Sequence, residues 1–153
     1  MKQDIERLME TRGVDAVLVM GATAGNPNLF YAVDGAGLTN AVYLKKKGAP
    51  PHLVHGPMER DQARATGIPT STFVENDLPR FVETAGGDGA EAQAAFLSHL
   101  LAKQAITGKV GVYGSGEMSR LYPILRRLSD VPGVNLYEEP NGRSLFEEAR
   151  ITK

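Results

Sequence analysis

The chain has 153 residues, of which 42% are hydrophobic and 23% charged, as in a single globular domain large enough to bury a core. Its 17 basic and 18 acidic residues leave a net charge of −1, so the composition favours neither a nucleic-acid partner nor an anionic membrane. The absence of cysteine excludes disulfides and thiolate metal sites and fits a cytoplasmic location. No apolar run has the length of a membrane span or of a signal-peptide core.

The first third of the chain is organised around residues 14–20, a short run that is apolar on both sides. Such a run predicts a strand covered on both faces, in the middle of an α/β sheet. Before it, residues 4–12 have the one-face spacing of an amphipathic helix, and Gly13 fits its C-terminal cap. After it, residues 21–28 predict a loop at the carboxyl end of the strand, where α/β sheets usually bind ligands. Residues 29–33 fit either a short helix or a strand.

The middle third predicts an antiparallel hairpin. Residues 40–46 predict a strand, with Ala41, Tyr43 and Lys45 on one side and Val42 and Leu44 on the other. A turn follows at 47–50, and a short return strand covers 51–55. The connection is too short for a parallel crossover, so the sheet must be mixed. A polar helix with Ala63 inward is then expected, followed by a strand over 69–74 and a helix over 77–84 that packs Leu78, Phe81 and Val82 inward.

The last third predicts two strands and three helix segments. Asp88 and Glu91 have the spacing of a capping box for a helix that ends near residue 107, and Ser144 and Glu147 have it for a last helix reaching residue 150. Strands are expected at 109–113 and 134–138. Between these strands we expect a helix with Ser115 as its N-cap, which Pro123 kinks or shortens. The apolar stripe of this helix consists of Met118, Leu121, Tyr122, Leu125 and Leu128. The order of elements predicts a three-layer α/β/α domain with a mixed, mostly parallel sheet.

Catalytic motifs are missing from the sequence. His52 and His55, three apart on one strand, face opposite sides, and His99 is expected to pack on a helix. No H-E-x-x-H motif occurs, and Asp15 is the only acid in the central strand. The glycines of residues 111–116 follow the order G-x-x-G-x-G without a partner lysine, which argues against a nucleotide site. We therefore expect neither catalytic residues nor a metal site in this chain.

The order of these segments resembles the N-terminal domain of the creatinase/prolidase/aminopeptidase P family, the M24 metallopeptidases. The resemblance rests on an amphipathic helix ending at Gly13, an N-x-x-Y stretch ending at Tyr31, and a hairpin followed by the acidic helix of residues 58–63. It continues with a K-V-G-V strand at 109–112 and the terminal segment 148–153. Two departures, at 32–34 and at Tyr113, leave the substrate open among Xaa-Pro dipeptides, longer Xaa-Pro peptides and creatine-like amidines.

The resemblance implies a ribonuclease-H-like domain over residues 1–148, with 149–153 starting a linker to a catalytic domain outside this sequence. That domain would carry a dinuclear Mn, Co or Zn centre held by two Asp, one His and two Glu. This chain would then be the non-catalytic N-terminal part of a Xaa-Pro peptidase-like homodimer, in which its loop 34–40 helps shape the active-site cleft. Tyr31, Asp34 and Leu38 are the candidate cleft residues, although a core role for Tyr31 and plain loop roles for the other two are also open. A free-standing small-molecule-binding or regulatory module and a nucleotide-binding domain are the alternative functions.

Overall fold

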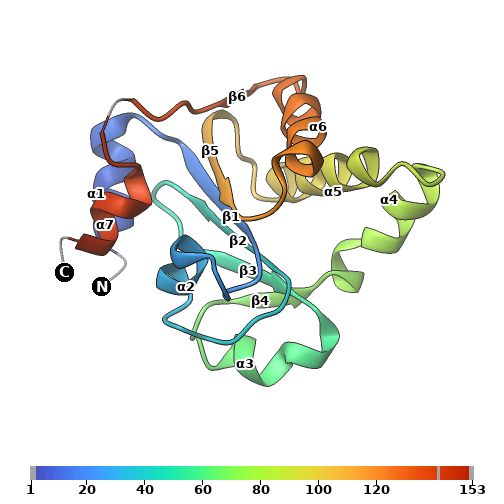
Figure 1. Ribbon diagram of the computed structural model, residues 1–153, viewed down its shortest axis with the longest axis horizontal. Coiled ribbons are helices and arrows are strands. Elements are labelled where there is room, and N and C mark those ends of the chain that lie inside the picture. The colour runs from blue at the N-terminus through green and yellow to red at the C-terminus, as the bar shows by residue number, and fades with distance from the viewer. Residues whose placement is uncertain (1–2, 141, 152–153) are drawn as a thin grey trace.

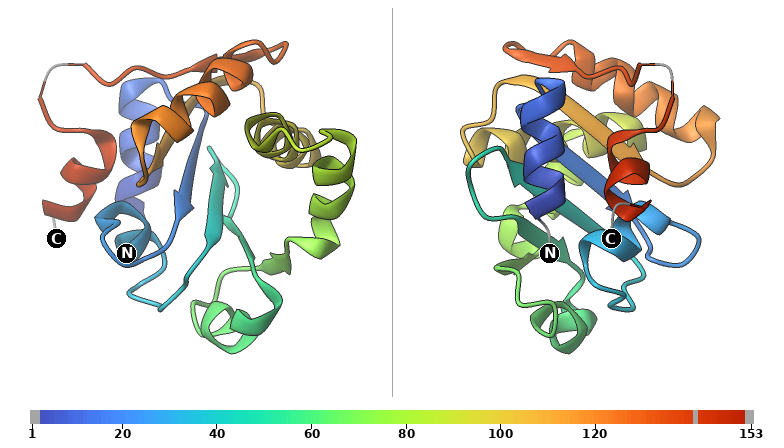
Figure 2. Two further views of the ribbon diagram at one scale, coloured as in Figure 1. Left: turned by 45° about the vertical axis from the view of Figure 1, so that its right-hand side comes forward. Right: turned by 90° about the vertical axis from the view of Figure 1, so that its left-hand side faces the viewer.

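The computed structural model describes residues 3–140 and 142–151. They form one six-stranded sheet in the order β4-β3-β2-β1-β5-β6, with helices on both faces (Figure 1). Three layers are visible when the sheet is seen edge-on, with α1, α2 and α7 on one side and α4 and α5 on the other (Figure 2). The predicted three-layer α/β/α class is confirmed.

The elements follow one another with short connections. The strands are β1 (Ala16–Gly21), β2 (Ala41–Lys46), β3 (His52–His55), β4 (Thr70–Thr72), β5 (Gly108–Gly114) and β6 (Val134–Leu136). The α-helices are α1 (Gln3–Arg12), α2 (Pro27–Ala32), α3 (Arg60–Arg64), α4 (Leu78–Thr84), α5 (Gly89–Lys103), α6 (Met118–Ser129) and α7 (Leu145–Ile151). Two 3₁₀ turns, η1 (Pro57–Glu59) and η2 (Val74–Asn76), precede α3 and α4.

The central strand β1 divides the core into two layers because successive side chains point to opposite faces of the sheet. Val17 and Val19 pack under α1, α2 and α7, in a layer that also holds Phe146. Ala16 and Leu18 pack on the other face, under α5 and α6. All four of these β1 side chains are fully buried, as expected for a strand covered on both sides.

The sheet is mixed, and the predicted hairpin accounts for its antiparallel part. Strand β2 runs antiparallel to both β1 and β3, with Leu18 opposite Leu44 and Val42 opposite Val54. The pairings β1–β5, β3–β4 and β5–β6 are parallel, so parallel pairs predominate among the described strands. Of the two structures predicted for residues 29–33, a short helix or a strand, the helix is the one observed, because Pro27 begins α2 with Asn26 as its cap.

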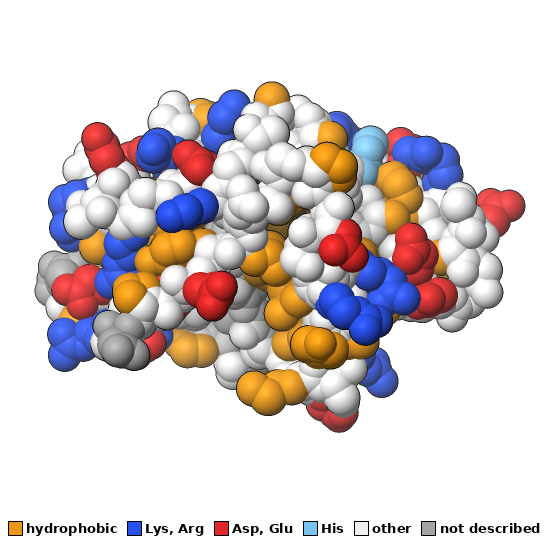
Figure 3. Space-filling model, turned by 90° about the horizontal axis from the view of Figure 1, so that it is seen from above, with side chains coloured by type: hydrophobic (Ala, Val, Ile, Leu, Met, Phe, Trp, Pro, Cys, Tyr) orange, Lys and Arg blue, Asp and Glu red, His pale blue; other side chains and the backbone are white. Residues whose placement is uncertain are grey.

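Several local predictions are wrong, among them the end of the strand expected over 69–74, since β4 stops at Thr72 and η2 begins at Val74. Val82, predicted to pack inward, is 52% exposed, and so are Met118 (84%) and Tyr122 (64%) of the predicted apolar stripe. Hydrophobic side chains accordingly reach the surface when the molecule is viewed from above (Figure 3). Ser115 is not the cap of α6, since the helix begins two residues later with Glu117 at the N-cap position. An amphipathic pattern identifies residues that share a face, but it does not say how far the rest of the protein covers that face.

The longest helix of the described residues is α5, with 15 residues. A helix needs about 20 predominantly apolar residues to cross a bilayer. Over residues 3–140 and 142–151, no helix combines the required length with the required hydropathy.

Candidate functional site

The predicted cleft region begins at the turn from β1 into α2. Asn26 is buried and ties the two elements together. Its side-chain oxygen accepts a hydrogen bond from the Leu29 amide at 3.3 Å, and its side-chain nitrogen donates to the Met20 carbonyl at 3.1 Å. Because the cap also holds the end of β1, α2 has a fixed position at the carboxyl edge of the sheet.

Tyr31 and Asp34 meet at a surface hollow beside α2. The hollow encloses about 460 Å³ and is lined by Pro27, Phe30, Tyr31, Asp34, Gly35 and Arg150. Tyr31 is 7% exposed and belongs to the core under α1 and α7, and burial, together with the nearby Asp4 and Asp34, raises its pKa. Asp34 is exposed and adopts a positive φ of 53°, which turns the chain out of the helix. The structure therefore brings these two predicted residues together.

Leu38 has a different position from the other two predicted residues. Its side chain is 2% exposed and lies in the core. Its backbone is held by Thr23: the Thr23 amide donates to the Leu38 carbonyl at 2.9 Å, and the Leu38 amide donates to Thr23 Oγ1 at 3.0 Å. Leu38 thus anchors loop 34–40 against loop 21–26. Its position fits a residue that supports the loop from within the core.

The hollow contains one carboxylate and one guanidinium, from Asp34 and Arg150. Arg150 Nε is buried and has no hydrogen-bond partner in the part of the chain that the structure describes. This pair can orient a polar ligand, but it offers neither a nucleophile with a base nor a set of metal ligands.

The histidines lie apart from this hollow. His52 Nε2 is 2.7 Å from Ser71 Oγ, His55 Nδ1 is 2.6 Å from the Gly56 carbonyl oxygen, and the His99 ring packs 5.1 Å from the Phe81 ring. Within residues 3–140 and 142–151, no three His, Cys, Asp or Glu side chains come together in a way that could hold a metal ion.

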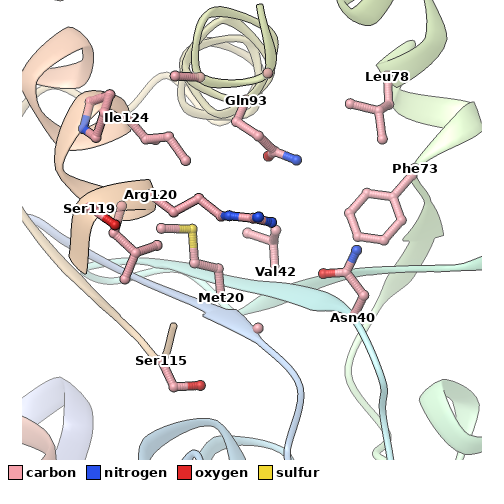
Figure 4. Close-up of a pocket in the computed structure, with 15 residues that line it drawn as sticks. Met20, Asn40, Val42, Phe73, Leu78, Gln93, Ser115, Ser119, Arg120 and Ile124 are labelled. Carbon is pink, nitrogen blue, oxygen red and sulfur yellow. The ribbon is translucent and has the colours of Figure 1, made fainter. Parts of the chain in front are cut away.

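Sequence reasoning missed a cavity that encloses about 580 Å³ at the carboxyl edge of β1 and β5. In Figure 4, Arg120 extends from α6 into it, above Met20 and Val42 of the sheet and facing Gln93 of α5. Two signals could have located it: Gly21 ends β1 and Ser115 follows β5, and the ends of adjacent parallel strands commonly form ligand clefts. Arg120 itself carries no recognisable motif, because its role depends on how α5 and α6 flank the sheet.

Comparison with known proteins gives a likeness in structure only. No protein-family model matches the chain, and no curated protein matches it in sequence. Among solved structures, the prolidase from Pyrococcus horikoshii OT3 superposes with a TM-score of 0.54 at 17% identity. A dipeptidase from the same organism superposes with a TM-score of 0.57, also at 17% identity.

Each match covers nearly all of this chain but only a minor part of the enzyme. Each match includes 97% of this chain but only 34% of the prolidase and 36% of the dipeptidase. The chain thus spans about a third of the length of these enzymes. At this level of identity the likeness establishes the fold, and the fold is the one predicted from the sequence. This chain has the fold of the N-terminal domain of prolidase.

Proposed function

We propose that the chain is the non-catalytic N-terminal domain of a Xaa-Pro peptidase-like metalloenzyme. One observation carries the proposal: nearly all of this chain superposes on about a third of a prolidase and of a dipeptidase. The catalytic reaction would take place in the remaining two thirds of such an enzyme. There, a dinuclear Mn²⁺, Co²⁺ or Zn²⁺ centre would activate the attacking water.

The proposed role of this domain is to complete an active-site cleft in a homodimer. The loop with Asp34 and the hollow beside α2 lie at one edge of the sheet, and Asp34 is exposed. The Thr23–Leu38 hydrogen bonds hold the base of the loop, and Glu59 accepts a hydrogen bond from the Thr39 amide at 2.7 Å. A loop fixed at its base can present side chains to a neighbouring subunit at little cost in conformational entropy. We also propose a cytoplasmic location, in keeping with a chain without cysteine.

The first experiment reads the gene beyond the codon for Lys153. The proposal requires the reading frame to continue into a domain with two Asp, one His and two Glu as metal ligands. A reading frame that stops there would favour the free-standing binding module instead.

The second experiment uses the parent protein, with and without residues 1–148. We expect the complete protein to be a dimer by light scattering and to cleave Xaa-Pro peptides. The truncated protein should lose the dimer and most of its turnover. In the complete protein, Asp34→Ala should raise KM for the peptide without changing the metal content, whereas Glu83→Ala, an exposed change on α4, should leave KM unchanged. Equal KM values for the two variants would rule out the proposed role of the loop.

A further inference from the structure

The cavity around Arg120 has the size and lining of a small-molecule site. Its volume of about 580 Å³ falls within the range of about 300–1,000 Å³ that ligand pockets occupy. Apolar side chains supply most of the lining, namely Met20, Val42, Phe73, Leu78, Leu121 and Ile124. Asn40, Gln93 and Ser119 add a few hydrogen-bonding groups. An apolar cavity with a few polar groups is typical of a site for a small organic molecule.

Arg120 is the one charged residue in this lining, and no Asp or Glu side chain of the described residues contributes to it. Its guanidinium extends between the sheet and α5 (Figure 4). Arg127, seven residues further along α6, pairs instead with Asp88 at 3.4 Å and with Glu91 at 3.0 Å. Across the described chain, no carboxylate lies within ion-pairing distance of Arg120. Arg120 is solvent-exposed, so the cavity has at its open side a cation that no carboxylate of the described residues pairs with.

The start of α6 lies beside the cavity, where the N-cap residue Glu117 is itself acidic and its carbonyl accepts a hydrogen bond from the Arg120 amide at 3.0 Å. Ser119 and Arg120 stand in its first turn, and in the described structure the N-cap residue Glu117 makes no side-chain hydrogen bond to that turn. The amides at the start of a helix and its dipole both favour an anion nearby. The electrostatics and the shape thus favour the same ligand, one with an anionic head and an apolar body.

We infer that this cavity binds a small organic monocarboxylate, with its carboxylate on Arg120 and its apolar body against Phe73, Leu78 and Ile124. A planar guanidinium binds a carboxylate through two parallel hydrogen bonds. Free amino acids and dipeptides should bind more weakly, because no Asp or Glu side chain of the described residues lines the cavity to pair with their ammonium group. The inference rests on the lining of this cavity alone and does not depend on the proposed peptidase role.

The experiment titrates ¹⁵N-labelled 153-residue chain with matched ligands and follows the amide resonances. The carboxylates are 3-phenylpropionate and 4-methylpentanoate. The controls are 3-phenylpropionamide, which lacks the charge, and L-phenylalanine, which adds an ammonium group to the same skeleton. We expect saturable shifts at the side-chain amides of Asn40 and Gln93 and in the first turn of α6 with at least one carboxylate. The binding should be about tenfold tighter than that of either control, since a charge-assisted pair contributes roughly that factor.

Two variants of α6 locate the carboxylate. Arg120→Gln should weaken binding about tenfold, while Arg126→Gln, an exposed arginine on the same helix outside the cavity lining, should leave it unchanged. Dispersion of the amide spectrum checks that both variants are folded. The inference is overturned if neither carboxylate saturates, if the amide or phenylalanine binds as tightly, or if the two variants behave alike. It is also overturned if the same resonances shift with protein concentration alone, because a second copy of the chain would then cover the cavity.

Discussion

His52 stands at one end of a chain of hydrogen bonds that joins β3 to α5. Asn76 donates to Ser71 Oγ at 2.8 Å, and Lys103 Nζ donates to Asn76 Oδ1 at 2.8 Å. Because Ser71 Oγ already accepts from Asn76, its own hydrogen is available to His52 Nε2 at 2.7 Å. The network therefore suits the neutral form of the imidazole. Burial, followed by the positive charges of Lys103 and His55, lowers the pKa of His52 below its ordinary value.

This pKa shift predicts a pH dependence of stability. The folded pKa lies below the unfolded one, so the unfolded chain binds the proton more readily as the pH falls through about 6.5. The contribution of His52 to the free energy of unfolding should therefore fall from neutral pH until the folded pKa is passed. We expect wild type to lose more stability than His52→Gln between about pH 7.5 and about pH 5.5, measured as urea midpoints. Parallel losses in the two proteins would contradict this assignment.

Gly114 is required where β5 passes the end of β1. It pairs with Met20, and a Cβ at this position would lie 2.7 Å from the Met20 carbonyl oxygen. Gly114→Ala must shift one of the two strands, and we expect a loss of about 1–3 kcal/mol in the free energy of unfolding. Gly37→Ala is the control, since an added Cβ there meets none of the described atoms within 4 Å. Urea unfolding of both variants is the measurement, and equal stability would argue against this close approach of the strands.

Single-residue roles were predictable from the sequence only where the local pattern determines them. Tyr31 could be assigned to the core because it stands beside an apolar run, and it is buried. Leu38 could not be assigned, because its side chain packs in the core while Thr23, fifteen residues earlier in the chain, holds its backbone. Arg120 could not be singled out either, since its surroundings come from α4, α5 and the strands β1 and β2. A local sequence pattern does not show which distant segments will contact a residue in the fold.

The starts of α5 and α7 were predicted correctly because a cap is a local hydrogen bond, whereas the start of α6 was not. The Asp88 carboxylate accepts from the Glu91 amide at 3.0 Å and begins α5 as predicted. At α7 the capping box is reciprocal: Ser144 Oγ accepts from the Glu147 amide, and Glu147 Oε1 accepts from the Ser144 amide, both at 3.2 Å. The strand over 40–46 was also predictable, because the alternation of its side chains between two faces is a local pattern.

Removal of the α7 cap should weaken the attachment of the helix to the domain. Ser144→Ala leaves the Glu147 amide without its acceptor, and we expect a loss of about 1 kcal/mol in the free energy of unfolding. Ser129→Ala is the matched control: its hydroxyl donates to the Arg126 carbonyl at the exposed end of α6, so the change should stay within about 0.5 kcal/mol. Chemical denaturation measures both variants. Identical midpoints for the two would mean that the capping box contributes nothing to stability.

The core also determines how α7 attaches to the rest of the molecule. Leu145, Phe146 and Ala149 are fully buried, and the Phe146 ring packs edge-on against Tyr113 with 4.9 Å between centroids. This side of α7 faces the same layer as α1. The helix is therefore part of the domain core, even though its cap contributes only a small share of its stability.

The class of fold followed from the sequence, while the arrangement of its parts did not. A tight turn between two strands determines their antiparallel relation, so the mixed sheet could be predicted. The order β4-β3-β2-β1-β5-β6 depends on which edge of β1 receives β5, and packing of α5 and α6 decides that at long range. The 580 Å³ cavity arises from the same packing, which is why no single segment predicts it.

The distribution of ionisable groups over the whole molecule determines what the chain can catalyse. Carboxylates are used in ion pairs and caps far from one another: Glu139 pairs with Arg12 at 3.1 Å, and Glu6 pairs with Lys45 at 2.6 Å. Asp15 accepts a hydrogen bond from the Lys109 amide at 2.8 Å at the start of the central strand. A dinuclear hydrolase needs several carboxylates and usually a histidine arranged to bridge two ions.

We therefore expect the 153-residue chain alone to hydrolyse no Xaa-Pro peptide and to hold no divalent metal at a defined site. Purified chain would be incubated with Mn²⁺, Co²⁺ or Zn²⁺ and dialysed. It would then be assayed against Xaa-Pro substrates, with its metal content measured by mass spectrometry. His52→Gln and His99→Gln, at the two half-buried histidines, serve as matched controls for loosely held ions, since any such ion should dissociate on dialysis from wild type and variants alike. Turnover that survives repurification, or about two metals per chain as in two-metal hydrolases, would refute the proposal that the chemistry belongs to a separate catalytic domain.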